Sequence, residues 1–294
     1  GMWRVPARVP APLVDLDDLR SRLPMHLRRL RRTGHREQLP REPPPIAPVF
    51  AASRRFDLSQ VDFFIDSFVL GALATGNFSG KKFTVQQWNG IVMILHQYDS
   101  SVDLAQHWFQ FERLLTGSGT ERMDQEANHV GHLQVMRLGN FSVLAAAPAS
   151  VVDDQQRLVE LDVEAKPVWP KLIFRMMTLG CESLQHGVIH GDVLRKIDSY
   201  DIWQLIDKYS VQERARFAIS IVDALSTIRT LVGTQQTPFA LDSWSTFGSP
   251  TLLPLPAKRS LLPTADVMER LFPGSAEAGG DTDSFEPRRI DSGR

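Results

Sequence analysis

The sequence predicts a mainly α-helical fold with a small inserted β-hairpin, in which a helical core is flanked by extended amino- and carboxy-terminal arms. Three observations support this prediction. Residues 1–55 are basic and rich in proline, apolar residues recur at helical spacing through most of residues 56–245, and residues 131–164 change to near-alternating polarity. Residues 246–294 contain further prolines and end in a polar tail. The chain therefore divides into an arm, a mostly helical core and a tail.

The amino-terminal arm is cationic. Residues 1–55 contain twelve Arg, five acidic residues and no Lys, although the whole chain of 294 residues has a formal net charge of −1. Repeated prolines favour an extended or polyproline-like backbone, because proline fixes φ and lacks a backbone donor. Residues 13–32 are the exception, since their leucines recur at helical spacing. An arm of this charge on a mildly acidic body can bind nucleic acid or an acidic neighbouring subunit.

Apolar periodicity predicts the helices of the core. Residues 56–115 give three helices: Trp88, Ile91 and Leu95 mark the second, and residues 102–115 form the third. The later helices are expected at residues 171–184, 200–208, 211–231 and 265–272.

The inserted β element is predicted from a change of period. Residues on either side of Gly139 and Asn140 nearly alternate between apolar and polar, and Gly-Asn is a two-residue hairpin signal. Residues 158–163 alternate as well and give a third strand. We therefore expect a small β element near residues 131–164, among helices.

The composition excludes several classes of protein. Cys181 is the only cysteine, so neither an intramolecular disulfide nor a Cys-based zinc cage can form, and a reducing compartment is indicated. No apolar run approaches the roughly 20 residues that cross a bilayer. Arg and Pro also interrupt the first residues, where a signal peptide is continuously apolar. We expect an intracellular, non-secreted protein with no membrane partner and no cofactor.

One cluster has the residue types of a metal site. On a helix, His186 and His190 at i and i+4 would share a face, and Asp192 would complete a His-His-carboxylate set for zinc or iron. Two glycines inside this segment oppose a regular helix. Loop histidines with structural hydrogen bonds are therefore the other interpretation.

A set of cations in the second half of the chain has the residue types of an RNA interface. Lys171, Arg175 and Arg216 could each neutralise a backbone phosphate. A solvated helix face is the other interpretation of each of them.

Four features occur in a fixed order along the chain: FTVQQWNG at 83–90, a passage from helix to hairpin at 108–144, AKPVW at 165–169 and ARFA at 215–218. Together they resemble the coat proteins of flexuous filamentous plant viruses, in particular the potyvirus-like group. The resemblance implies a helical polymer that packages single-stranded RNA. It also implies that Lys171 or Arg175, together with Asp223, takes over the RNA contacts of that family, whose positions are occupied here by Pro170 and Ser220.

These observations predict a non-enzymatic coat or nucleocapsid subunit that binds single-stranded RNA through backbone phosphates and forms a homopolymer through its amino-terminal arm, in a virion or the host cytoplasm. The expected RNA-binding residues are Lys171, Arg175, Arg216 and Asp223. Two alternatives stay open. One is a metal-dependent hydrolase that uses His186, His190 and Asp192, and the other is a protein-only scaffold or effector subunit of a larger complex.

Overall fold

The computed structural model describes residues 10–27, 58–76, 82–97, 102–117, 131–149, 151–242, 250–257 and 260–262. The chain divides into two units after Leu261, and the elements below belong to the first, Gly1–Leu261. Most of the predicted amino-terminal arm and the helix expected at 265–272 lie outside the described residues.

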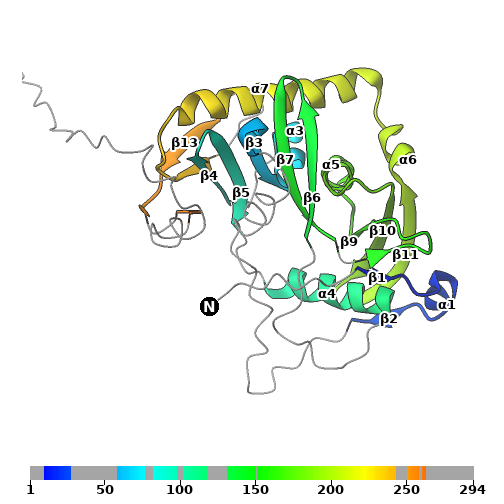
Figure 1. Ribbon diagram of the computed structural model, residues 1–294. Helices are drawn as coiled ribbons and strands as arrows, with labels where there is room; N and C mark the ends of the chain where they lie inside the picture. Colours follow the sequence, from blue (N-terminus) through cyan, green and yellow to red (C-terminus); the bar gives the residue numbers. More distant parts are fainter. Residues whose placement is uncertain are drawn as a thin grey trace, which may run out of the picture. The chain divides into compact units, whose positions relative to one another are not determined.

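The largest sheet of the described structure has seven strands (Figure 1). Strand β3, inside the sheet, runs parallel to both of its neighbours, β5 and β7, whereas the other neighbouring pairs are antiparallel. In spatial order the strands are β13 (Thr251–Pro254), β12 (Phe239–Asp242), β4 (Lys82–Trp88), β5 (Ile91–Gln97), β3 (Phe63–Asp66), β7 (Phe141–Pro148) and β6 (Gly131–Leu138).

A four-stranded sheet lies apart from the large one. Strand β10 runs parallel to β9 and antiparallel to β11, and β2 pairs with the far side of β11. In spatial order the strands are β2 (Met25–His26), β11 (Val193–Asp201), β10 (Ser183–His190) and β9 (Val159–Glu164). Two short strands, β1 (Ala11–Pro12) and β8 (Val151–Val152), pair with each other separately.

The helices were predicted better than the strands. The helices expected at 102–115 and 211–231 are present as α4 and α7, and the longer of them starts at a capping box in which Ser210 and Glu213 bind each other's backbone N–H groups. The helices are α1 (Leu16–Ser21), α3 (Val69–Thr75), α4 (Val102–Thr116), α5 (Trp169–Leu179), α6 (Ile202–Ile206) and α7 (Val211–Val232), with a 3₁₀ turn at Leu58–Gln60.

The prediction of a mainly helical fold is wrong, because strand is as abundant as helix and forms large multi-stranded sheets. The hairpin predicted around Gly139 and Asn140 exists as β6 and β7, but it is one edge of the seven-stranded sheet rather than an insertion among helices. Residues 183–190, which overlap the end of a predicted helix, are strand β10.

The largest error concerns β4 and β5, which were predicted as a helix. Every residue from Ile91 to Leu95 is at most 3% exposed, so β5 is covered on both faces and its sequence is continuously apolar. Periodicity cannot separate such a strand from a buried helix. The distinguishing signal was the turn: Asn89 and Gly90 both have positive φ, of 47° and 82°, which a type I′ hairpin turn requires.

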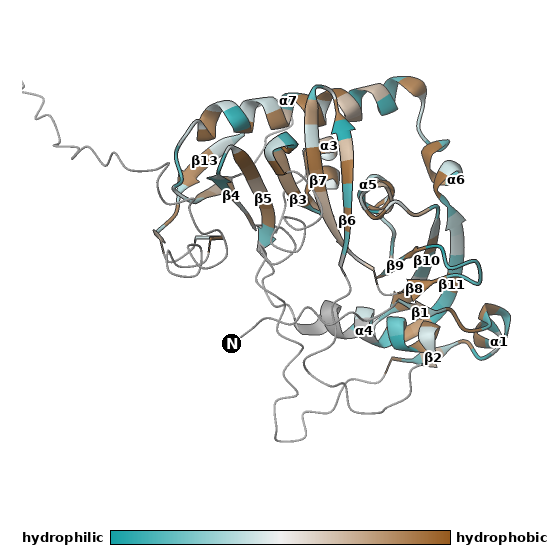
Figure 2. Ribbon diagram, in the orientation of Figure 1, coloured by the Kyte–Doolittle hydropathy of each residue, from teal (hydrophilic) through white to brown (hydrophobic). Residues whose placement is uncertain are grey.

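Three apolar clusters bind the layers together. The first joins one face of the large sheet to α3 and α7, and Figure 2 shows the hydrophobic residues of β3, β5 and β7 there. The second joins α1 and α4 to one face of the small sheet. The third joins α5 and α6 to β7 and β10. Helix α5 therefore contacts the large sheet on one side and approaches the small sheet on the other (Figure 1).

Helix α3 and helix α5 cross so closely that one of them needs a glycine. A Cβ on Gly71 would lie 3.0 Å from the Cα of Lys171, closer than backbone atoms normally allow. We expect Gly71→Ala to lower the free energy of unfolding by about 1–3 kcal/mol, because α5 must shift to admit the methyl group. Urea denaturation measures this. Alanine is the better helix former by up to about 1 kcal/mol, so unchanged or increased stability would contradict the close crossing.

Candidate functional site

Strand β9 carries two carboxylates into the interior. Side chains alternate along a strand, and Val159, Leu161 and Val163 lie in the apolar cluster with α4. Glu160 and Asp162 therefore point to the opposite face, toward α5. Each residue is only 3% exposed. Buried carboxylates of this kind require compensating partners.

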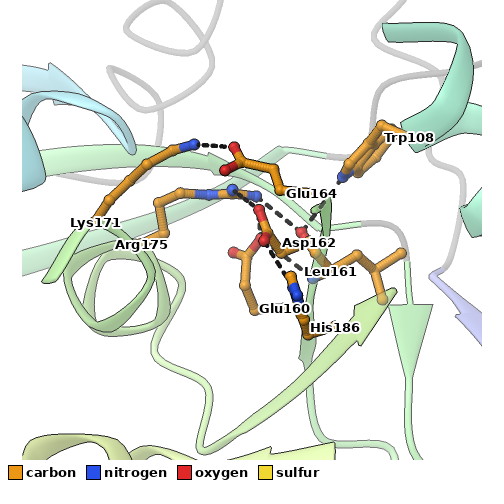
Figure 3. A network of polar contacts seen from close by, with 8 residues as sticks. All are labelled: Trp108, Glu160, Leu161, Asp162, Glu164, Lys171, Arg175 and His186. Atoms are coloured by element: carbon orange, nitrogen blue, oxygen red, sulfur yellow. Dashed lines mark hydrogen bonds and ion pairs between the residues drawn. The ribbon is translucent and has the colours of Figure 1, made fainter. Parts of the chain in front are cut away.

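Arg175 of α5 is the principal partner of both carboxylates (Figure 3). One terminal nitrogen, Nη2, donates to Glu160 Oε1 and, at 3.0 Å, to the carbonyl oxygen of Leu161. The other, Nη1, is 3.3 Å from Asp162 Oδ1. The Arg175 side chain is 6% exposed. One buried cation is thus shared by two buried carboxylates.

His186 completes this cluster from the neighbouring strand. It lies directly opposite Asp162 in the parallel pairing of β9 and β10, and its Nδ1 is 2.9 Å from Asp162 Oδ2. The pairing makes Nδ1 the donor. Nε2 is buried and has no hydrogen-bond partner among the described residues. Leu184, which lies opposite Glu160 in the same pairing, contributes no polar atom. We call Glu160, Asp162, Arg175 and His186 the buried cluster.

The buried cluster continues into a more exposed ion pair. Lys171 lies one turn before Arg175 on α5, and its Nζ is 2.7 Å from Glu164 Oε1 at the end of β9 (Figure 3). The two side chains are 21% and 31% exposed. This pair is the part of the network that solvent or a ligand can reach.

The surroundings of the two buried carboxylates shift their pKa values in opposite directions. Burial raises the pKa of Glu160, the nearby charge of Asp162 adds to this effect, and Arg175 only partly opposes it. Burial alone would raise the pKa of Asp162 as well, but the hydrogen bond from His186 and the charge of Arg175 outweigh it and lower that pKa. Asp162 is therefore the more stable anion, and Glu160 is the carboxylate that takes up a proton first.

Cys181 lies next to the buried cluster and is buried. Burial, and secondarily the charge of Glu160, raises the pKa of its thiol to about 12. Because the thiolate is the reactive form, we expect native protein to react with a thiol reagent at pH 8 roughly a thousandfold or more slowly than an unfolded cysteine. Labelling with a chromogenic disulfide, before and after denaturation, measures this. Fast stoichiometric labelling of folded protein would contradict the burial of Cys181.

The predicted RNA-binding residues fall into two groups. Lys171 and Arg175 lie on α5 and are engaged by Glu164, Glu160 and Asp162. Arg216 and Asp223 lie on α7, and both are exposed.

The structure does not assemble the predicted metal ligands as the sequence suggested. His186 is buried against Asp162, whereas His190 is exposed at the end of β10. Asp192 follows in the turn, where its Oδ1 is 3.1 Å from His107 Nε2. On a strand, residues i and i+4 are about 13 Å apart, so the helical spacing argument does not apply. Within the described part of the chain, no group of three or more His, Cys, Asp or Glu side chains could hold a metal ion.

Sequence reasoning missed Glu160 and Asp162. Their alternation with Val159, Leu161 and Val163 was recognised as a strand, but the polar face was not recognised as an interior one. A signal was available in the helix that follows this strand. Lys171 and Arg175 lie four residues apart and therefore share one face of that helix. A strand with two acids close before such a helix predicts ion pairs between the acids and these cations.

Comparison with known proteins identifies the fold but no family. No family model matches the sequence, and no curated protein matches it either. Among solved structures, S. pombe Rai1 matches with a TM-score of 0.61 and 15% identity, over 84% of this chain and 87% of that chain. A mutant of S. pombe Rai1 in complex with 3′-FADP matches with a TM-score of 0.61, 14% identity and the same coverage.

A second Rai1 structure matches less closely. Scheffersomyces stipitis Rai1, in complex with (3′-NADP)⁺ and calcium ion, gives a TM-score of 0.50 and 11% identity, over 73% of this chain and 74% of that chain. The calcium ion can be tested against the residues present here. Arg175 and His186 already engage the carboxylates of the buried cluster. The buried cluster therefore does not fit a divalent cation.

These comparisons overturn the coat-protein hypothesis. The segment 83–90 that resembled a helix start is β4 and its turn, and ARFA at 215–218 lies inside the surface helix α7. The solved structures that this chain matches are of Rai1 proteins and not of coat proteins. The predictions of a non-enzymatic capsid subunit, of a homopolymer assembled through the arm and of a virion location are therefore wrong. No described helix is long and apolar enough to cross a membrane. The chain has the fold of Rai1.

Proposed function

We propose that this chain is an RNA-processing enzyme that binds the 5′ end of RNA and acts there. One observation carries the proposal: the likeness to S. pombe Rai1 extends over 84% of this chain and 87% of that chain, so it covers most of both chains rather than a shared motif. Rai1 proteins act on RNA caps and 5′ ends. An intracellular location is part of the proposal, and it agrees with the single cysteine.

The ligands of the solved Rai1 structures support recognition of a terminal nucleotide. S. pombe Rai1 is solved with 3′-FADP and S. stipitis Rai1 with (3′-NADP)⁺, and both ligands are dinucleotides that carry several phosphates. We therefore propose that this chain recognises a phosphate-bearing 5′-terminal nucleotide. A ligand of this kind needs a cation that it can reach.

Lys171 is the cation that we propose for this contact. It is partly exposed and forms an ion pair with Glu164, at the accessible end of the buried cluster. An ammonium group can exchange a carboxylate for a phosphate oxygen without leaving a buried charge unpaired. Arg175 cannot do so, because its guanidinium is buried between Glu160 and Asp162.

The proposal is tested with short RNAs of one sequence that differ only at the 5′ end: a hydroxyl, a monophosphate, a triphosphate or a dinucleotide cap. Binding is measured by fluorescence anisotropy at several salt concentrations, and cleavage is followed by gel electrophoresis of 5′-labelled RNA. We expect tighter binding of the phosphorylated or capped RNAs than of the 5′-hydroxyl RNA, competition by 3′-FADP, and product release from the 5′ end. Equal binding of all four RNAs without cleavage would overturn the proposal.

A matched pair of variants tests the role of Lys171. Lys171→Gln removes the proposed phosphate contact, whereas Arg216→Gln removes an exposed cation on α7. We expect Lys171→Gln to weaken binding of the 5′-phosphorylated RNA by about 1–3 kcal/mol, and Arg216→Gln to have little effect. Equal losses in both variants would indicate only a diffuse electrostatic attraction.

A further inference from the structure

The buried cluster contains two buried negative charges, which the rest of the protein must compensate. The side chains of Glu160 and Asp162 are 4% and 5% exposed, and they are neighbours on the face of β9 that points toward α5. Removing two carboxylates from water costs several kcal/mol for each ion unless a cation and hydrogen bonds compensate. Two like charges at this separation also repel each other. A folded chain with this strand therefore needs a cation at this place.

Either a metal ion or a cationic side chain can compensate two buried carboxylates in a protein. S. stipitis Rai1 is solved with a calcium ion. Calcium takes six to eight oxygen ligands at about 2.3–2.6 Å, and carboxylates supply most of them in typical sites. In this chain, side-chain cations or hydrogen-bond donors already engage three of the four carboxylate oxygens. Arg175 binds Glu160 Oε1 and Asp162 Oδ1, and His186 binds Asp162 Oδ2.

The surroundings of the two carboxylates also lack further ligands. The residue of β10 paired with Glu160 is Leu184, which has no oxygen in its side chain. The residue paired with Asp162 is His186, whose Nδ1 faces the carboxylate. Within the described residues, no third acidic or histidine side chain joins the pair in a geometry that could hold a metal. The side chain that contacts both carboxylates is the cation Arg175.

We propose that Arg175 is a built-in counter-cation, which takes the place of a divalent metal ion in the buried cluster and keeps this site free of metal. The guanidinium suits this position because its planar fork presents several N–H groups at once. It contacts both carboxylates and the carbonyl oxygen of Leu161, so one side chain links three acceptors along β9. Helix α5 holds it there, through Lys171 and Glu164 one turn earlier.

This inference goes beyond the proposed function and does not depend on it, because it concerns the ion content of the buried cluster. Binding of Mn²⁺ and of Ca²⁺ to the full chain is measured by isothermal titration calorimetry, and Mn²⁺ is also followed by the loss of its free-ion electron paramagnetic resonance signal. We expect the Glu160→Gln and Asp162→Asn variants to give the same ion titrations as the wild-type protein. A saturable ion site that either substitution abolishes would overturn the inference.

Removal of the guanidinium gives the opposite expectation. Arg175→Met leaves both carboxylates without their shared buried cation, although His186 still contacts Asp162, and it is expected to bind Mn²⁺ at least about tenfold more tightly than wild type. The double variant Arg175→Met/Glu160→Gln should lose that gain. Unchanged ion affinity in folded Arg175→Met, judged by circular dichroism, would count against the inference. Where Arg175→Met does not fold, the wild-type titration with Glu160→Gln still decides the question.

The RNA assays are read separately from the ion titrations. Metal-free wild-type protein that binds 5′-phosphorylated RNA supports both proposals. Metal-free protein without 5′-end preference leaves Arg175 as the counter-cation and overturns only the proposed function. A wild-type ion site at Glu160 or Asp162 together with a preference for 5′-phosphorylated RNA would support the proposed function and overturn the role of Arg175 as counter-cation.

Discussion

Arg175→Met is expected to lower the free energy of unfolding by about 3–5 kcal/mol, because truncation of one partner in a buried ion pair leaves the other charge buried and uncompensated. Arg175 is 5% exposed and neutralises two carboxylates, which are each 3% exposed. Methionine keeps a flexible chain as far as the position of Nε and lacks the end of the guanidinium, so the effect is mainly that of the lost charge and its hydrogen bonds. Urea denaturation at neutral pH, followed by circular dichroism, gives this value.

The size of this effect can be compared with that of a surface ion pair in the same protein. Arg229 of α7 is 2.6 Å from Asp62 Oδ1, but its side chain is 47% exposed. Arg229→Met is therefore expected to cost less than about 1 kcal/mol, as exposed ion pairs usually do. Equal effects of the two substitutions would show that Arg175 is not in a desolvated environment.

A second substitution should recover part of the stability lost in Arg175→Met. The neutral form of Glu160 is favoured by burial, so Glu160→Gln removes a charge that the fold tolerates poorly once the arginine is gone. We expect the double variant Arg175→Met/Glu160→Gln to be more stable than Arg175→Met alone, although each single substitution destabilises the protein. Strictly additive losses would contradict direct coupling between these two side chains.

The sequence predicted elements whose signals are local and failed for those that depend on distant partners. Helix α7 begins at the capping box of Ser210 and Glu213, and its apolar period extends over many turns. The β6–β7 hairpin follows from Gly139 and Asn140 between alternating strands. Asn89 and Gly90 are an equally local signal, but the apolar run of β5 was assigned to a helix and the turn was read as part of it.

The buried cluster was harder to predict for a different reason. Its ion pairs join β9 to α5 and β9 to β10, and the partners lie 13 to 24 residues apart in the sequence. A charged residue is normally assigned to the surface, so Arg175 was interpreted as a phosphate contact, and His186 either as a metal ligand or as a loop histidine with structural hydrogen bonds. Only the parallel register of β9 and β10 shows that His186 faces Asp162.

The fold of the small sheet determines which side of β9 is polar. Because Leu161 faces α4 and its neighbours face α5, a shift of β9 by one residue would place both carboxylates against the apolar helix α4. The aromatic packing on the α4 side therefore fixes the position of the charged side chains on the α5 side. The most central residue of that packing is Phe111.

Phe111→Ala is expected to lower the free energy of unfolding by about 3–5 kcal/mol, the usual cost of truncating a fully buried aromatic side chain. Phe111 of α4 is 0% exposed, and its ring lies so close to β10 that a Cβ on Gly187 would be 2.9 Å from it. Trp203→Ala serves as the control, because Trp203 of α6 is 62% exposed and should cost far less. Urea denaturation compares the two variants. If Phe111→Ala were no more costly than Trp203→Ala, α4 would not pack on the small sheet as described, and the register that directs Glu160 and Asp162 toward Arg175 would lose its main support.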